Sequence, residues 1–408
     1  MPQLLSINNY YYRRGGSEAV FFEHNRLLEE AHWTVVPFSM HDPKNLPTPW
    51  SRHFADAAEF ENAHSLRDKL SAATKIVYSF EAARRIRALI ASARPTIAHA
   101  HNIYHHLSPS ILRELRREGI PVVLTLHDFK IACPAYAMFT QGAVCERCRG
   151  GALHNVITHR CIKGSTLMSA LIWLESTVHR TLKLYTRNVT RFVTPSRFLL
   201  AKFGEWGMDT SRFVYIPNFI DLDGFEPNAS GGDTFVYAGR LAPEKGVATL
   251  IRAAARAEVR LRIVGTGSDE SRLRQLAAQS GGNVEFSGYL SGAKLREVVA
   301  SARAVVVPSE WYENAPLSVM EAYALGRPVI GARIGGIPEL IREGETGFMF
   351  EAANVDSLTE VLSHVQALPQ SKLGQMGSAG RERMRSEFSP ELYRNRMLSL
   401  YQTIEPSI

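Results

Sequence analysis

Short apolar runs alternate with amphipathic stretches along the second half of the chain. Strands are predicted at residues 234–238, 261–264, 284–287 and 304–307 and from 328, and helices at 247–257, 270–278, 293–302 and 316–324. Ser291 stands where the N-cap of the helix at 293–302 is expected. Because strands that alternate with helices form parallel sheets covered on both faces, this pattern predicts a doubly wound α/β domain.

The first half follows the same pattern less regularly. Strands are predicted at 4–7, 34–38, 96–99, 122–125 and 191–194, and an amphipathic helix at 17–31. Residues 163–191 are predicted to form one basic helix with an apolar face. The segment 216–232 is rich in turn residues, so we expect a second α/β domain joined to the first by a linker there.

The length and composition are typical of a soluble globular protein. The 408 residues are 45% hydrophobic and 21% charged, which suggests two or three domains. The chain has no apolar run of about 18 residues, and its start lacks the basic and long apolar regions of a secretory signal. These observations predict a cytoplasmic protein without a transmembrane helix.

Basic residues are concentrated in the first half. Residues 1–215 contain 27 Lys and Arg against 17 Asp and Glu, whereas the remainder contains 20 against 23. A basic half favours anionic partners such as phosphates, acidic lipid headgroups or nucleic acid. Three interpretations of the basic stretch 163–191 stay open: contact with an anionic membrane surface, a wall of an acceptor site, or an ordinary core helix with a solvated face.

Two glutamates, Glu313 and Glu321, lie eight positions apart around the start of a predicted helix. Pro316 suits the first helical position, and backbone amides at a helix start bind anions such as phosphate. The residues expected to form this anion site are Asn314, Ala315, Pro316 and Leu317. A carboxylate binds a vicinal diol well because it accepts two charge-assisted hydrogen bonds. A nucleotide sugar presents a diol, a diphosphate and a second diol in this order. The simplest alternative is that Glu313 and Glu321 are solvated charges on a loop and on a helix.

Other polar and glycine residues follow predicted strands, where ligands bind in parallel α/β sheets. In the second half these are Arg240, Lys245, Gly265 and Tyr289. A guanidinium and an ammonium group at one strand end are suited to hold a diphosphate and to offset the charge that develops on it. Tyr289 could stack on a base, with packing in the core as the alternative.

In the first half, Gly15 and Gly16 follow the first predicted strand, and His127 follows the strand at 122–125. The glycine pair lets backbone amides approach a phosphate or a sugar. It is not a Gly-x-Gly-x-x-Gly motif, so a dinucleotide-dependent dehydrogenase is not expected. A histidine at a strand end can donate to a sugar hydroxyl or stabilise charge, although backbone partners alone would also explain it.

Several segments together resemble motifs of the retaining glycosyltransferases of family four. They are Ile216–Asp221, Ala238–Gly246, Val264–Gly267, Glu313–Glu321 and Gly335–Leu340. The resemblance implies the GT-B fold, in which two Rossmann-like domains face each other across a cleft. The implied parts are an acceptor-binding domain at 1–215 with an insertion at 129–165, a linker at 216–232, a donor-binding domain at 233–390, and a final helix at 391–408 that crosses back to the first domain.

The resemblance also implies an activity. The chain would transfer a hexose from a UDP- or GDP-type sugar to an acceptor hydroxyl, with retention of anomeric configuration. The implied catalytic residues are Glu313, His127, Arg240 and Lys245. Glu313 would bind the hexose and Glu321 the ribose, and no catalytic metal or other cofactor is required. The usual acceptors of the family and the basic first half favour a lipid-linked saccharide of envelope or exopolysaccharide synthesis as the acceptor. The reaction would then take place at the inner face of the cell membrane.

Other functions are compatible with parts of the pattern. A nucleotide-sugar epimerase or a soluble sugar-phosphate transferase has the same fold, but neither explains the basic stretch. A non-catalytic sugar-binding scaffold would not need the intact set of Glu313, Glu321, Arg240 and Lys245. A basic nucleic-acid-binding protein leaves the two glutamates unexplained, and basic and aromatic residues are not interleaved. We therefore expect no nucleic-acid partner.

All four cysteines fall within one short window. They are Cys133, Cys145, Cys148 and Cys161, with His154 and His159 as further candidate ligands. Four thiolates suffice for a tetrahedral structural zinc ion, whereas a reducing cytoplasm disfavours disulfides. Structural zinc and thiols without metal both stay open. A similar cysteine-bearing insertion occurs in some bacterial, polysaccharide-type members of the family that the chain resembles.

Overall fold

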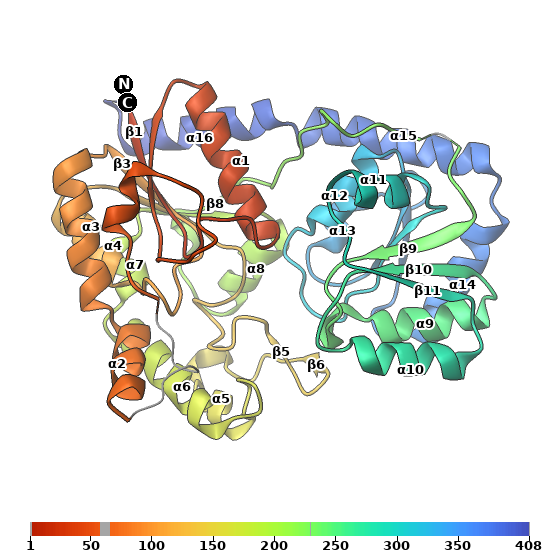
Figure 1. The fold of residues 1–408 in the computed structure, drawn as a ribbon, viewed down its shortest axis with the longest axis horizontal. Helices are drawn as coiled ribbons and strands as arrows, with labels where there is room; N and C mark the ends of the chain where they lie inside the picture. Colours follow the sequence, from red (N-terminus) through yellow and green to blue (C-terminus); the bar gives the residue numbers. More distant parts are fainter. Residues whose placement is uncertain (1, 58–65, 229, 408) are drawn as a thin grey trace. The chain divides into compact units, whose positions relative to one another are not determined.

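A computed structural model describes residues 2–57, 66–228 and 230–407 (Figure 1). The chain divides into two compact units. Unit 1 comprises residues 1–138, 146–216 and 393–408, and unit 2 comprises residues 139–145 and 217–392. No helix among the described residues is long and apolar enough to cross a membrane.

Unit 1 is built on a six-stranded parallel sheet. Its strands, in spatial order, are β2 (Thr34–Phe38), β1 (Gln3–Ile7), β3 (Ile97–Ala100), β4 (Val122–Thr125), β7 (Arg191–Thr194) and β8 (Phe213–Tyr215). Every residue of β3 and β4 is buried, as expected for central strands of a sheet covered on both faces. The helices are α1 (Gly16–Glu30), α2 (Leu66–Val77), α3 (Phe80–Ala93), α4 (Ser110–Arg117), α5 (Asn155–Thr158), α6 (Thr166–Thr181), α7 (Leu184–Asn188) and α8 (Arg197–Glu205).

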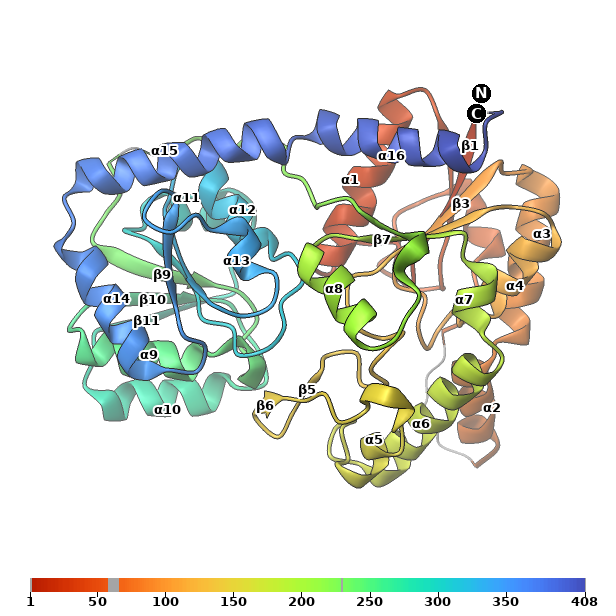
Figure 2. The ribbon, with the colours of Figure 1, turned by 180° about the vertical axis from the view of Figure 1, so that it is seen from behind.

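Unit 2 contains a second six-stranded parallel sheet. Its strands, in spatial order, are β11 (Val284–Gly288), β10 (Arg260–Val264), β9 (Thr234–Ala238), β12 (Val305–Val307), β13 (Val329–Ala332) and β14 (Gly347–Phe350). The helices are α9 (Val247–Arg256), α10 (Glu270–Ser280), α11 (Gly292–Ala300), α12 (Leu317–Ala324), α13 (Ile337–Leu340), α14 (Val355–Ala367) and α15 (Gln370–Glu387). Helix α9 packs against α10 and α14, and α12 packs against α15 (Figure 2). The predicted α/β class is therefore confirmed, with two Rossmann-like sheets.

Two local predictions need correction, and one short element comes in addition to those predicted. Residues 163–191 form two helices, α6 and α7, because Lys183 adopts a left-handed conformation (φ 52°) between them, and Arg191 already begins β7. Ser291 occupies the N-cap position of α11, but its side chain accepts no hydrogen bond there. A short hairpin of β5 (Phe139–Thr140) and β6 (Ala143–Val144) lies within the cysteine-bearing stretch and was not expected.

The last helix, α16 (Pro390–Ile404), contributes two buried tyrosines to unit 1. The Tyr401 hydroxyl lies 2.5 Å from Nδ1 of His99 and 3.1 Å from Nε2 of His24. The Tyr393 hydroxyl lies 3.1 Å from Nδ1 of His24, and Nε2 of His99 lies 2.7 Å from Oγ1 of Thr125. Burial lowers the pKa of His24 to about 3 and that of His99 well below its ordinary value, so both rings are neutral. A neutral polar network therefore fastens α16 to α1 and to the sheet.

Replacing Tyr401 with phenylalanine should destabilise the protein more than replacing Tyr393. The first change leaves one nitrogen of His24 and one of His99 without a partner, whereas the second affects His24 alone. An unsatisfied buried polar group costs about 1–3 kcal/mol. Urea unfolding of the two single variants measures the difference, and equal losses would show that the network does not hold the helix.

Candidate functional site

The order of strands in unit 2 fixes where a site can form. Strand β9 comes first along the chain but lies in the middle of the sheet, between β10 and β12. The crossovers therefore change direction between β9 and β12, and ligands of such sheets bind at this switch point, beyond the carboxyl ends of the strands. Arg240 and Lys245 follow β9, and Glu313 follows β12. The topology thus gathers predicted site residues that are far apart in sequence.

Lys245 and Glu313 meet at this switch point. Nζ of Lys245 lies 2.7 Å from Oε1 of Glu313, and the hydroxyl of Ser309 donates to the same oxygen at 2.7 Å. The Lys245 ammonium also lies 4.8 Å from the centre of the Trp311 ring. Burial by itself raises the pKa of Glu313, but the charge of Lys245 and these hydrogen bonds outweigh it and hold the pKa below its ordinary value. Glu313 is therefore a buried carboxylate that stays ionised.

Glycines bring the surrounding loops into contact. The Gly336 amide donates to the Glu313 carbonyl at 2.7 Å, and a Cβ on Gly335, which has φ +60°, would lie 2.4 Å from that carbonyl oxygen. Gly265, with φ +134°, passes so close to the loop after β9 that a Cβ would lie 1.9 Å from the Gly239 carbonyl oxygen. Neither position can hold a side chain without a shift of the backbone.

Replacing Gly335 with alanine should lower both stability and activity. Gly344→Ala is the matched control, since Gly344 also has a positive φ (+73°) but its Cβ would meet no described atom within 4 Å. Both variants bear the backbone penalty of about 1 kcal/mol, and Gly335→Ala adds the clash with Glu313. Thermal unfolding and activity of the two variants separate these effects. Equal losses in both would show that the contact with Glu313 is unimportant.

The start of helix α12 differs in detail from the prediction. The helix begins at Leu317, and Pro316 occupies the N-cap position (φ −67°, ψ 118°) instead of the first helical turn. Pro316 has no backbone N–H, so it cannot serve an anion as a donor. The preceding loop is held by Asn218, whose side-chain amide donates to the Ala315 carbonyl at 3.3 Å. The backbone N–H groups that α12 can offer to an anion therefore begin at Leu317.

Glu321 lies in the second turn of α12. Burial raises the pKa of its carboxyl group. No hydrogen bond or ion pair joins this carboxylate to another residue in the described part of the chain. A half-buried carboxylate without a partner among the described residues is costly unless a ligand supplies donors, which favours the predicted binding role of Glu321.

Arg240 and Tyr289 lie at the solvent-exposed part of the same sheet edge. The Arg240 side chain is 61% exposed and forms an ion pair with Glu244 at 2.5 Å. Tyr289 follows β11 and is 73% exposed, which excludes the alternative that it packs in the core. Both side chains are therefore available to a ligand.

Unit 1 places its own predicted residues at strand ends. Gly15 is the N-cap of α1 with an extended backbone (φ −165°), so this position does not require glycine for its conformation. His127 follows β4, and its Nε2 lies 2.9 Å from Nδ1 of His101. Burial lowers the pKa of His127 to about 4, so the ring is neutral at physiological pH. Because His101 engages Nε2, the side-chain atom of His127 left for a ligand is Nδ1.

Sequence reasoning missed His101 and the buried pair of Lys130 and Glu175. Nζ of Lys130 lies 2.6 Å from Oε2 of Glu175, and Nδ1 of His105 lies 3.2 Å from Oε1. Burial alone would raise the pKa of Glu175, but the charge of Lys130 and the neighbouring His105 keep it lowered. Glu175 is the single acidic residue between positions 151 and 200. A lone acidic residue in a basic stretch is the sequence feature that could have pointed to this pair.

Within the described part of the chain, three histidines form a cluster of candidate metal ligands. Among the described residues, the set of three or more ligand atoms within 4.8 Å of one another comes from His24, His99 and His101. Both nitrogens of His24 and of His99 already serve the tyrosine and threonine hydroxyls, which favours a structural network. The cysteines lie in both units: Cys133, Cys148 and Cys161 in unit 1, and Cys145 in unit 2. The zinc site stays a prediction.

Two family models together match most of the chain. The model described as Glycosyltransferase Family 4 matches residues 14–223, and the model described as Glycosyl transferases group 1 matches residues 221–383. The chain is 32% identical over 234 residues to the GDP-mannose-dependent monoacylated alpha-(1-6)-phosphatidylinositol monomannoside mannosyltransferase of Corynebacterium glutamicum, covering 51% of this chain and 61% of that protein. It is 27% identical over 181 residues to the putative colanic acid biosynthesis glycosyltransferase WcaL of Salmonella typhimurium, covering 41% and 45%. The matches thus span less than two thirds of these relatives.

Solved structures share the whole architecture. Sucrose-phosphate synthase from Thermosynechococcus elongatus matches with a TM-score of 0.72 at 18% identity, covering 100% of both chains. Anabaena HepE in complex with UDP and glucose matches with a TM-score of 0.70 at 15% identity, covering 99% of this chain and 100% of that one. At such identities the similarity establishes the fold, which is GT-B.

Proposed function

Since the chain belongs to glycosyltransferase family 4, we propose that it transfers a hexose from a nucleoside-diphosphate sugar to an acceptor hydroxyl with retention of anomeric configuration. The observation that carries this proposal is the ion pair of Lys245 with the buried, ionised Glu313 at the switch point of unit 2. A cation beside a carboxylate suits a nucleotide sugar. The cation can bind the leaving phosphate, and the carboxylate can bind the hydroxyls of the sugar on the other side of the glycosidic bond.

The proposed binding roles follow from the charge of each side chain. Lys245 and the exposed Arg240 hold the diphosphate and offset the charge that develops on it as the glycosidic bond breaks. Glu313, kept ionised by Lys245, accepts hydrogen bonds from hexose hydroxyls, and Glu321 accepts from the ribose diol. Amides at the start of α12 assist the phosphates. His127 and Gly16, from unit 1, contact the sugar.

In the proposed mechanism the leaving group serves as the base. A diphosphate oxygen takes the proton of the acceptor hydroxyl on the face from which the diphosphate departs, so the new bond forms with retention. This requires no carboxylate base, and it gives Glu313 and Glu321 binding roles. The half-buried, neutral His127 donates a hydrogen bond without adding charge.

The donor is proposed to be a UDP or GDP sugar, and the acceptor a lipid-linked saccharide of envelope or exopolysaccharide synthesis at the inner face of the cell membrane. The names of the relatives support this: a GDP-mannose-dependent enzyme of a phosphatidylinositol mannoside, a colanic acid glycosyltransferase, and a UDP and glucose complex. The basic character of residues 1–215 favours an anionic acceptor.

The test is a panel of UDP, GDP and ADP sugars, each labelled at the anomeric carbon and incubated with the enzyme and lipid extracts. Transfer of label from one donor, with the α-anomer conserved in the product by NMR, is expected. Conversion of the donor to an epimer without an acceptor would favour an epimerase. No reaction and no binding of any donor would remove the transferase proposal.

A further inference from the structure

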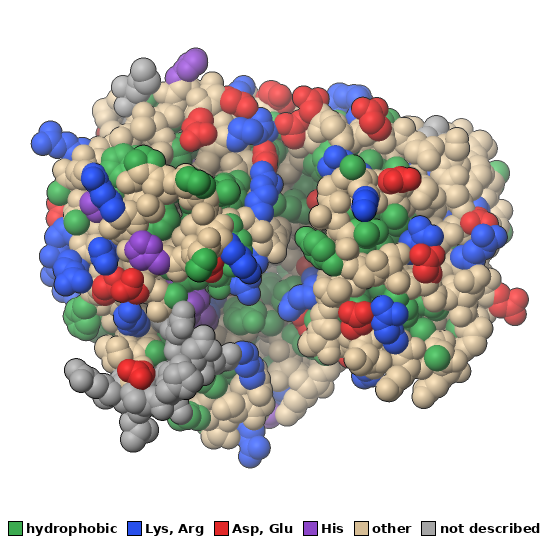
Figure 3. Space-filling model, viewed as in Figure 1, with side chains coloured by type: hydrophobic (Ala, Val, Ile, Leu, Met, Phe, Trp, Pro, Cys, Tyr) green, Lys and Arg blue, Asp and Glu red, His purple; other side chains and the backbone are tan. Residues whose placement is uncertain are grey.

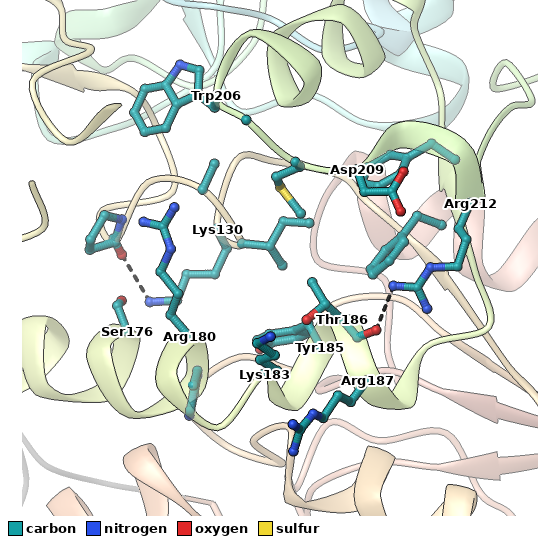
Figure 4. A pocket seen from close by; sticks show the side chains of 18 of the residues that line it. Lys130, Ser176, Arg180, Lys183, Tyr185, Thr186, Arg187, Trp206, Asp209 and Arg212 are labelled. Carbon is teal, nitrogen blue, oxygen red and sulfur yellow. Dashed lines mark hydrogen bonds between the residues drawn. The ribbon is translucent and has the colours of Figure 1, made fainter. Parts of the chain in front are cut away.

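A cavity of about 510 Å³ lies within unit 1 (Figure 4). Its walls come from some of the residues in the segments 130–134, 176–187 and 206–213, together with Leu153 and Phe192. The volume lies within the range of small-molecule binding sites, about 300–1,000 Å³. None of the residues proposed above for donor binding or catalysis lines this cavity.

The break between α6 and α7 creates one wall. The left-handed Lys183 ends the run of α6 and lets α7 turn, so that residues of both helices face the same space. Arg212 holds α7 on the other side, because it donates to the Thr186 carbonyl at 2.6 Å (Figure 4). It also donates to the Val189 carbonyl at 2.8 Å. The break between α6 and α7 at Lys183 thus shapes the cavity.

The cavity has a partly apolar lining. The rings of Phe192 and Phe213 are stacked with centres 4.7 Å apart, and Trp206 is only 5% exposed. The wall also holds three buried polar atoms without a hydrogen-bond partner among the described residues: Ser176 Oγ, Tyr185 OH and Trp206 Nε1. Buried polar groups in native proteins are nearly always satisfied, so three around one cavity indicate donors that a ligand can use after small side-chain rotations.

The cavity carries unbalanced positive charge. Arg180, Lys183 and Arg187 form no ion pair with a described residue. Lys130, by contrast, is neutralised by Glu175. The one acidic residue in the lining, Asp209, accepts from the Ser211 amide at 3.0 Å and is thereby used as a local cap. Three unpaired cations beside aromatic walls select an anion that carries an apolar group.

We propose that this cavity binds an anionic amphiphile, a phosphate group joined to an apolar chain. Arg180, Lys183 and Arg187 hold the phosphate, and Phe192, Trp206 and Phe213 pack against the chain. The cavity shares no lining residue with the proposed donor site, and its ligand goes beyond the proposed transferase activity.

The experiment is calorimetric titration of the full-length protein with farnesyl phosphate, farnesol and inorganic phosphate, each below its aggregation limit and without a nucleotide sugar. We expect farnesyl phosphate to bind at least about tenfold more tightly than either fragment, because only it satisfies both halves of the cavity. A free-phosphate site would bind inorganic phosphate equally well, and that result would overturn the proposal.

The triple variant Arg180→Gln, Lys183→Gln and Arg187→Gln should lower the affinity for farnesyl phosphate by about tenfold or more. The matched control removes three exposed arginines of unit 1 that do not line the cavity, Arg84→Gln, Arg94→Gln and Arg113→Gln. An equal loss in the control would show mere attraction to a basic surface and would reject the site. Because no donor is present, failure here leaves the transferase proposal untouched.

Discussion

Replacing Lys245 with alanine is expected to lower kcat by about 10²–10³-fold, the effect of removing one preorganised electrostatic group from a transition state. The change also leaves the buried Glu313 without its cation, which should cost about 1–3 kcal/mol of unfolding free energy. Steady-state kinetics with the identified donor and urea unfolding measure the two losses separately. Glu360→Gln, an exposed change on α14, is the control and should alter neither quantity.

The double variant Lys245→Ala and Glu313→Gln separates stability from catalysis. Removing both charges of the pair relieves the unpaired carboxylate, so stability should recover relative to Lys245→Ala alone. Activity should not recover, because the proposed phosphate-binding cation and the proposed sugar-binding carboxylate are then both missing. A double variant that regains activity along with stability would show that the pair is only structural. The crowded loop at Gly335 gives an independent check, since it supports the Glu313 backbone without touching the carboxylate.

Replacing Glu321 with glutamine is expected to raise the KM for the donor by about tenfold or more and to stabilise the protein without ligand. The first effect follows from the proposed role of Glu321, because a neutral amide would replace a carboxylate that accepts two charge-assisted hydrogen bonds from the ribose diol. The second follows because burial raises the pKa of Glu321, so the folded protein disfavours its ionised form. Thermal unfolding with and without nucleotide measures both. A nucleotide at about 100 times its Kd should add about 2.7 kcal/mol to the wild type and less to the variant.

The pH dependence of this effect has a definite sign. Because the folded-state pKa of Glu321 lies above the unfolded value of about 4.3, the unliganded wild type loses stability as pH rises through these values. The advantage of Glu321→Gln should therefore be present near pH 7 and vanish in acid. Donor affinity of the wild type should fall on acidification at a higher pH than an ordinary glutamate would give. A variant that is less stable than wild type at neutral pH would assign Glu321 a structural role.

The corrections to the predicted elements have a common origin. Pro316 and Ser291 have the residue types of a helix start, but a cap is defined by one hydrogen bond or one pair of backbone angles, which the neighbouring loop decides. Residues 163–191 have helical periodicity throughout, and the left-handed Lys183 between α6 and α7 interrupts it where the chain turns towards Arg212. Such interruptions depend on contacts with distant residues, which local propensity does not contain.

The sequence by itself determined the alternation of strands and helices, the α/β class and the loops that carry Arg240, Lys245, Glu313 and Glu321, because apolar periodicity and motifs act within a few residues. Only the tertiary structure decided which of these loops meet. It brings Lys245 to Glu313, 68 positions away, because β9 pairs with β12, and it brings Tyr401 to His99, 302 positions away. It also joined His101 to His127 and formed the cavity behind Lys183. Strand order and helix packing follow from the burial of whole faces of sheets and helices. The free energy of this burial depends on many residues far apart in sequence, so no single position reveals it.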